Sequence, residues 1–156
     1  SLAKVASSHF LEMLNKTESF PCTTLRIFLT YGPGQDRNRF LPQIIYGCLS
    51  DKSFPTSEGE QLRDFCYIDD VVFIIQKCMG IRNKSYNMFN VCTSKKTYVK
   101  DLIKKIFKIK NKNPKISVIN STPGDQKGIY GNNNKIKKFF KIKNMTSLSV
   151  GLKKTI

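Results

Sequence analysis

Two spacings of hydrophobic residues alternate along the chain, and they predict a succession of helices and strands. In four segments the apolar residues recur every three or four positions, as on one face of a helix: residues 1–16, 39–50, 71–79 and 97–107. Between and after them lie short runs of β-branched and aromatic residues, which are typical of strands: 23–30, 62–68, 88–92 and 116–119. The chain shows no internal repeat.

Three of the predicted helices have residues near their start that suit a helix N-terminus. Asp69 and Asp70 precede one apolar run, where an aspartate can cap free backbone N–H groups and complement the helix dipole. Thr97 is the expected cap of the helix that follows it. Pro42 lies near the start of the 39–50 helix, where a missing N–H costs little.

Arg63 is the residue in the predicted strands that points most directly to a ligand. It stands near the start of an otherwise apolar strand. A planar guanidinium at such a place can hold a phosphate or a carboxylate through two parallel hydrogen bonds. The alternative is a surface ion pair with Asp64 or Glu60, which would carry no function. The strand alone leaves both interpretations open.

Three motifs, in order along the chain, favour a ligand-binding role for Arg63 over a surface ion pair. Residues 25–35 read LRIFLTYGPGQ, a strand that stops in a Gly/Pro turn, residues 39–42 read RFLP, and residues 59–71 read GEQLRDFCYIDDV. Together they resemble the nucleotide-sugar epimerase/dehydratase family, the extended short-chain dehydrogenases/reductases. The resemblance extends to a TPGDQ turn at 122–126 and to two closing helices at 134–140 and 146–154. It implies an α/β fold: the C-terminal part of a Rossmann-type doubly wound parallel sheet, with a small α/β substrate-binding subdomain.

The resemblance also implies that the chain begins inside an active-site helix. Family members open this helix with a Tyr-x-x-x-Lys pair, and residues 1–6, SLAKVA, match the part just after the tyrosine. Lys4 then falls on the lysine, and the tyrosine would immediately precede Ser1. The 156 residues also contain no GxxGxxG phosphate-binding loop. We therefore expect residues 1–156 to be the C-terminal portion of an epimerase/dehydratase domain, separated from its dinucleotide-binding half and inactive on its own.

The family's chemistry gives Lys4 a catalytic and a cofactor-binding role. Residues four apart share one helix face, so its ammonium would lie beside the phenol and lower the pKa of that group. The phenolate takes a hydroxyl proton from the sugar while a hydride moves to NAD or NADP. The expected enzyme is therefore an NAD(P)-dependent nucleotide-sugar epimerase/dehydratase that passes through a transient 4-keto sugar. Epimerisation, loss of water and reduction remain open as outcomes.

The resemblance assigns further residues to the cofactor and to a nucleotide-diphosphate sugar. Phe28 is expected near the cofactor, and Leu29 near the sugar, at a position where family members often have asparagine. The remaining substrate-binding residues are expected at the nucleotide (Arg39, Phe40 and Thr56), at the diphosphate (Arg39 and Arg63) and at the ribose hydroxyls (Asp125). Leucine cannot make the polar contact of asparagine, so the identity of the sugar stays open.

Positive charge is concentrated in the C-terminal part of the chain. The formal net charge is +16, and residues 95–156 hold seventeen lysines against two aspartates, without an arginine. A basic nucleic-acid-binding module is therefore one alternative. The lysines alternate with apolar residues at helical spacing, which favours a solvated helix face, and we expect no nucleic-acid partner. A catalytically inactive interaction subunit is the other alternative, because the first helix belongs to the surface through which family members commonly form homodimers.

Five cysteines, an odd number without CxxC spacing, argue against a zinc site and a thioredoxin-like motif. They lie in apolar segments, where a free cysteine behaves as a small buried hydrophobe. This favours a reducing, cytoplasmic setting without disulfides. The sequence has no signal peptide and no apolar run of about 18 residues, so no membrane span is expected.

Overall fold

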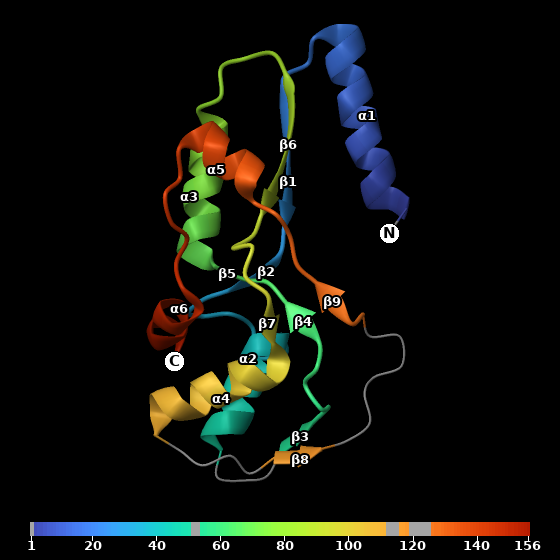
Figure 1. Cartoon of the computed structure of the whole chain (residues 1–156). Coiled ribbons are helices and arrows are strands. Elements are labelled where there is room, and N and C mark those ends of the chain that lie inside the picture. Colours follow the sequence, from blue (N-terminus) through green and yellow to red (C-terminus); the bar gives the residue numbers. More distant parts are fainter. Residues whose placement is uncertain (1, 51–53, 112–115, 119–125) are drawn as a thin grey trace.

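Helices and strands alternate along the described part of the chain (Figure 1). The structure is a computed structural model, and it describes residues 2–50, 54–111, 116–118 and 126–156. The helices are α1 (Leu2–Glu18), α2 (Phe40–Leu49), α3 (Ile68–Met79), α4 (Val99–Lys110), α5 (Asn134–Phe140) and α6 (Leu148–Thr155). The strands are β1 (Cys22–Ile27), β2 (Leu29–Tyr31), β3 (Phe54–Thr56), β4 (Leu62–Arg63), β5 (Phe65–Tyr67), β6 (Tyr86–Val91), β7 (Thr97–Tyr98), β8 (Ile116–Val118) and β9 (Gly128–Ile129).

Parallel pairing dominates among the described strands. β1 pairs with β6, β2 with β5 and β3 with β8, all in parallel. In a further sheet β4 lies between β7, which is antiparallel to it, and β9, which is parallel. Parallel strands joined through helices are typical of the α/β class, as the sequence predicted.

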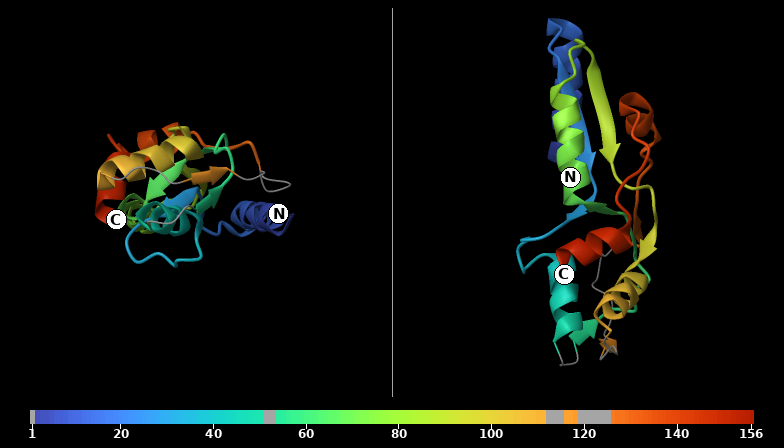
Figure 2. Two further views of the ribbon diagram at one scale, coloured as in Figure 1. Left: turned by 90° about the horizontal axis from the view of Figure 1, so that it is seen from below. Right: turned by 90° about the vertical axis from the view of Figure 1, so that its left-hand side faces the viewer.

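The β1–β6 pair is covered by helices on both sides. α1 runs along one side of it, whereas α3 and α5 lie on the other (Figures 1 and 2). Alternate residues of β6 are buried, because successive side chains of a strand point to opposite faces. The core between β6, α3 and α5 consists of Cys66, Val71, Ile74, Phe89, Val91 and Ile136.

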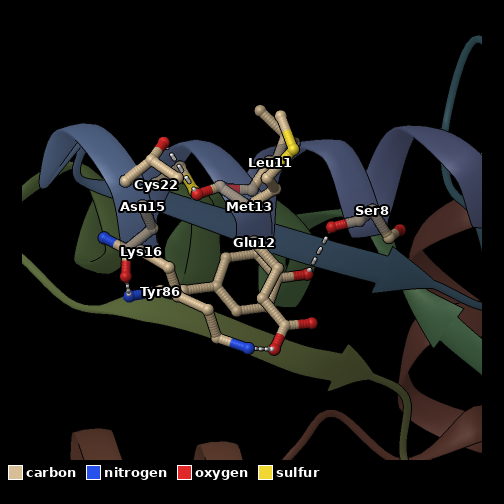
Figure 3. Close-up of polar contacts among 9 residues, drawn as sticks. Ser8, Leu11, Glu12, Met13, Asn15, Lys16, Cys22 and Tyr86 are labelled. Atoms are coloured by element: carbon tan, nitrogen blue, oxygen red, sulfur yellow. Dashed lines mark hydrogen bonds and ion pairs between the residues drawn. The ribbon is translucent and has the colours of Figure 1, made fainter.

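Polar contacts hold α1 against these strands, since none of its residues is buried (Figure 3). The side-chain oxygen Oδ1 of Asn15 accepts a hydrogen bond from the backbone N–H of Tyr86 at 3.0 Å. Asn15 Nδ2 donates to the carbonyl oxygens of Phe20 and Lys84, at 2.8 and 2.6 Å. The hydroxyl of Tyr86 donates to the carbonyl of Ser8 at 3.3 Å. The helix leaves several large apolar residues exposed: Leu2, Val5, Phe10 and Met13.

A second core lies between α2, α4 and α6 and includes side chains from β2 and β5. The sequence pattern predicted the α4 side of this core correctly. The buried residues of α4 are Val99, Leu102, Ile103, Ile106 and Phe107. Most lysines of the same helix are exposed: Lys104, Lys105, Lys108 and Lys110. The solvated lysine face predicted from the spacing is therefore confirmed for α4.

Two predicted strands are each divided in the structure. The 23–30 run forms β1 and β2, which leave Phe28 between them and pair with different strands, β6 and β5. The 62–68 run forms β4 and β5 on either side of Asp64. Both breaks let the chain pass from one sheet to another. Hydrophobic alternation does not register such a break, because the residues on both sides of it remain suitable for a strand.

The predicted helix caps are wrong for α3 and α4. Tyr67 occupies the N-cap of α3 without a side-chain cap bond, and Asp69 and Asp70 lie in the first turn. Tyr98 is the N-cap of α4, and Thr97 belongs to β7. In both cases a strand leads directly into the helix, so the last strand residue takes the N-cap position.

The five cysteines are free; Cys48, Cys66 and Cys92 are buried, whereas Cys22 and Cys78 are half-buried. Burial raises the pKa of the Cys48 and Cys66 thiols to about 12. A thiol with so high a pKa is almost entirely protonated at neutral pH and reacts slowly, so these two cysteines serve as packing residues.

Candidate functional site

An open cleft of about 870 Å³ lies where the chain leaves β1 and enters β2. Residues 26–31 form one continuous part of its lining, and residues 38–41 at the start of α2 form another. Lys4 borders the cleft from α1, and Phe65 and Ile129 also contribute. Ligands of open α/β sheets bind beyond the carboxyl ends of the strands, so the cleft has the position expected of a ligand site.

The cleft brings together five of the eight residues to which the sequence pointed. These five are Lys4, Phe28, Leu29, Arg39 and Phe40. They come from α1, from the junction of β1 and β2, and from the start of α2. Residues that are distant in the sequence thus share one surface, and the roles assigned to them remain predictions.

The other three residues do not line this cleft. Thr56 is the last residue of β3, where it lies opposite Val118 of β8. Arg63 is buried, with 8% of its surface exposed. Asp125, and with it most of the predicted 122–126 turn, lies outside the described residues.

Arg63 is held inside the protein by backbone carbonyl groups. Its Nη1 donates to the carbonyl oxygens of Leu62 at 3.0 Å and Gln126 at 2.8 Å. In the ladder of β4 and β9 it lies opposite Ile129, which lines the cleft. The arginine therefore sits one strand away from the cleft. Because Arg63 is buried, the alternative of a surface ion pair with Asp64 or Glu60 is excluded.

Asp64, next in the sequence, is a fully buried carboxylate that fixes a loop. Its Oδ1 accepts hydrogen bonds from the N–H and the hydroxyl of Thr93, at 2.8 and 2.6 Å. Its Oδ2 accepts one from the N–H of Ser94 at 2.9 Å. Ser94 has a φ of 63°, a left-handed conformation that is uncommon for serine. The carboxylate thus stabilises a turn that the loop would not favour by itself.

Aromatic rings support the cleft. Phe40 stacks on Phe65 with the ring planes 11° apart, and Tyr31 meets Phe65 edge-on at 84°. The hydroxyl of Tyr31 donates to the carbonyl of Leu148 at 3.5 Å. Burial, with a smaller effect of the Asp70 charge, raises the pKa of Tyr31. An enclosed, neutral phenol is no base, so Tyr31 does not replace the catalytic tyrosine that the family motif implies.

Three polar residues of the cleft were not singled out from the sequence: Arg26, Gln35 and Asn38. Arg26 and Gln35 lie inside the LRIFLTYGPGQ motif, which was therefore the signal that could have found them. Gln35 Nε2 donates to the carbonyl of Thr30 at 3.1 Å, but its Oε1 is buried and accepts no hydrogen bond from the described residues. A buried acceptor without a partner costs about 1–3 kcal/mol, so Gln35 is a candidate acceptor for a ligand's O–H or N–H.

The described residues contain neither a candidate metal site nor a candidate membrane-spanning helix. No group of three or more His, Cys, Asp or Glu residues there could hold a metal ion. No helix in the same part of the chain is long and apolar enough to cross a bilayer.

Comparison with known proteins shows the family to which the chain belongs. A family model, the NAD dependent epimerase/dehydratase family, matches residues 1–92, a segment that includes every element from α1 to β6. The chain belongs to this family. The resemblance drawn from the three motifs is therefore confirmed, and the family match includes nearly all of the lining of the cleft.

Individual relatives carry a variety of activities within this family. The CDP-abequose synthase of Salmonella typhimurium is 36% identical over 83 residues, which are 51% of this chain and 27% of that protein. The UDP-glucuronic acid 4-epimerase of Bacillus cereus, solved with UDP-glucuronic acid and NAD, is 26% identical with a TM-score of 0.86 over 98% of this chain. The UDP-glucose 4-epimerase of Thermotoga maritima, solved with UDP-glucose, is 27% identical with a TM-score of 0.86 over 99% of the chain.

These comparisons confirm the Rossmann-type α/β fold. The chain spans 49% of the Bacillus cereus enzyme and 50% of the Thermotoga maritima enzyme. It is thus similar to about half of each enzyme.

Proposed function

We propose that this chain forms the nucleotide-sugar-binding part of an NAD(P)-dependent epimerase or dehydratase that acts through a transient 4-keto sugar. The observation that carries the proposal is the cleft, in which Lys4 of α1 lies with residues 28–29 and 39–40. Its volume of about 870 Å³ falls in the range typical of ligand sites. Family membership supports the reaction class, and two similar enzymes were solved with a UDP-sugar.

The residues present fit a nicotinamide dinucleotide beside the sugar. Lys4 is exposed at the border of the cleft, and Phe28 adds an apolar surface next to it. NAD or NADP, when bound, accepts a hydride from the sugar. Lys4 would hydrogen-bond the nicotinamide ribose and stabilise the phenolate of a tyrosine one helical turn before it. That phenolate would take the hydroxyl proton of the sugar.

The substrate-binding residues divide by the part of the nucleotide sugar that each would meet. Leu29 would face the sugar, Phe40 and Thr56 the nucleotide, and Asp125 the ribose hydroxyls. Arg39 and Arg63 would hold the diphosphate, since a guanidinium binds phosphate oxygens through charge-assisted hydrogen bonds. Arg39 would do so from within the cleft, and Arg63 from β4, the strand that pairs with β9 and its Ile129.

Arg39→Ala should weaken binding of a nucleotide-diphosphate sugar roughly tenfold to a hundredfold, because one charge-assisted hydrogen bond to phosphate contributes about 1.5–3 kcal/mol. Calorimetric titration with UDP-, dTDP-, CDP- and GDP-sugars measures the change. Arg37→Ala is the matched control, since Arg37 is exposed in the same segment but does not line the cleft. Equal affinities in the two variants would remove Arg39 from the site.

Arg63→Ala should weaken the same binding roughly tenfold to a hundredfold, and Arg63→Lys should recover only part of the loss, because an ammonium cannot form two parallel hydrogen bonds. The alanine variant also loses the contacts to Leu62 and Gln126, so its thermal unfolding is measured alongside. A folded Arg63→Ala protein that binds every nucleotide sugar as tightly as the parent would leave Arg63 with a structural role alone.

Two observations support the proposed homodimer and cytoplasmic setting of the enzyme. The exposed apolar residues of α1 would be covered in a homodimer, as the family resemblance implies. The five free cysteines fit the reducing cytoplasm.

A further inference from the structure

A second hollow, of about 320 Å³, shares only Phe65 with the nucleotide-sugar cleft. Its lining comes from the loop that follows β6, from α4 and α5, and from residues 144–149 at the start of α6. Figure 1 shows α6 between α4 and α5. None of the residues assigned to the sugar or to the cofactor lines this hollow.

The hollow is strongly basic. Its lining includes four lysines and no aspartate or glutamate: Lys95, Lys96, Lys105 and Lys137. None of the four forms an ion pair with a described carboxylate; the ion pairs of the described residues involve other lysines. Lys96 Nζ lies 4.1 Å from the centre of the Tyr130 ring, a contact that leaves its charge in place. Several ammonium groups around one hollow attract a multiply charged anion.

Two carboxylates that do not line the hollow fix the loops that do. Asp64 accepts three hydrogen bonds from Thr93 and Ser94, as described above. Asp70 accepts hydrogen bonds from the N–H and the hydroxyl of Thr146, at 2.7 and 3.0 Å. Both oxygens of each carboxylate are thus used by the loops that line the hollow. The two negative charges lower the positive potential without offsetting four lysines, and they keep the lining in one arrangement.

The N-terminus of α6 adds to the attraction for an anion. Ser147 is its N-cap and accepts a hydrogen bond from the N–H of Val150. Leu148 and Ser149, in the first turn, both line the hollow. Free N–H groups and the helix dipole at such a place favour negative charge.

We propose that this hollow binds a compact polyphosphate group, such as pyrophosphate or the diphosphate end of a nucleotide. Its volume is at the lower end of the range for small-molecule sites and admits no nucleic-acid helix. Lysine ammonium groups bind phosphate as point charges and need no fixed planar geometry, which suits a site without arginine. The site is distinct from the nucleotide-sugar cleft, and the inference does not rest on the proposed function.

Calorimetric titration of the protein with sodium pyrophosphate tests this site. We expect saturable one-to-one binding at about 0.1 M salt, where long-range surface attraction is largely screened. The double variant Lys105→Gln/Lys137→Gln should bind at least about tenfold more weakly, because it loses two charge-assisted contacts. The matched control is Lys104→Gln/Lys138→Gln. It alters the same two helices and removes the same two positive charges, but at residues that do not line the hollow. Its affinity for pyrophosphate should stay within about twofold of that of the parent protein.

The outcomes separate a built site from a basic surface. Equal weakening in the two double variants, or no saturable binding to the parent protein, would overturn the proposal. Single-stranded RNA that binds more tightly than pyrophosphate and responds equally to both double variants would indicate a nucleic-acid surface instead. Lys95→Gln, in the loop, provides an independent variant should the helix variant unfold, and it should weaken pyrophosphate binding severalfold.

Discussion

Replacing Lys4 with methionine should lower kcat at least about a hundredfold in a protein that joins this chain to a dinucleotide-binding half, as the proposed function requires. Methionine keeps the apolar stem of lysine but lacks the ammonium, so it could not stabilise the phenolate that the proposed function places one helical turn before Lys4. Proton transfer assisted by a positioned acid or base contributes roughly a hundredfold or more. Lys4 is exposed on α1, so the substitution should leave the fold unchanged. Steady-state kinetics across pH measures both the rate and the shifted profile.

The matched control for this variant is Lys16→Met. Lys16 lies on the same helix and is exposed, and it does not line the cleft. Its Nζ forms an ion pair with Oε1 of Glu12 at 2.9 Å. Its loss should change kcat by less than about twofold and stability by a few tenths of a kcal/mol, as is usual for an exposed ion pair. A Lys4→Met enzyme with the rate and pH profile of the parent would make Lys4 a surface residue.

Asp64→Ala should destabilise the protein by about 3 kcal/mol, which is a large part of the stability of a small domain. The substitution removes a buried carboxylate and leaves the N–H groups of Thr93 and Ser94 without the acceptor that they have in the structure. Both N–H groups lie in a loop whose left-handed turn at Ser94 needs this support. Chemical denaturation with urea measures the free energy of unfolding.

Asp69→Ala is the matched control for stability. Asp69 lies in the first turn of α3, where its exposed carboxylate is 3.8 Å from Lys154. Its removal should cost less than about 1 kcal/mol, since exposed ion pairs contribute little. If Asp64→Ala were no less stable than Asp69→Ala, the loop at 93–94 would not depend on the buried carboxylate.

The sequence predicted the elements whose signals are local. The helical spacing identified the buried face of α4 correctly, because burial of one face imposes that spacing on the residues themselves. The three motifs identified the family because they consist of particular residues in a fixed order, which periodicity does not detect. The same motifs, together with the SLAKVA match that includes Lys4, pointed to five residues that the structure gathers in one cleft.

What the sequence did not reveal depends on contacts between distant segments. Asp70 suits a helix cap by position, but it binds Thr146, far along the chain. Phe28 and Asp64 separate strands that belong to different sheets, and no local pattern marks the change of partner. The lysines of the second hollow come from a loop and two helices, so their convergence exists only in the folded chain.

The proposed function requires that the cleft between α1, β2 and α2 binds a nucleotide sugar. Amide chemical-shift mapping of the isotope-labelled protein during titration with UDP-glucose and dTDP-glucose tests it most directly. We expect saturable shifts in the amides of residues 28–31 and 38–41, which line the cleft. Saturable shifts confined to the lysine-rich residues 95–156, with the cleft amides unchanged, would contradict it.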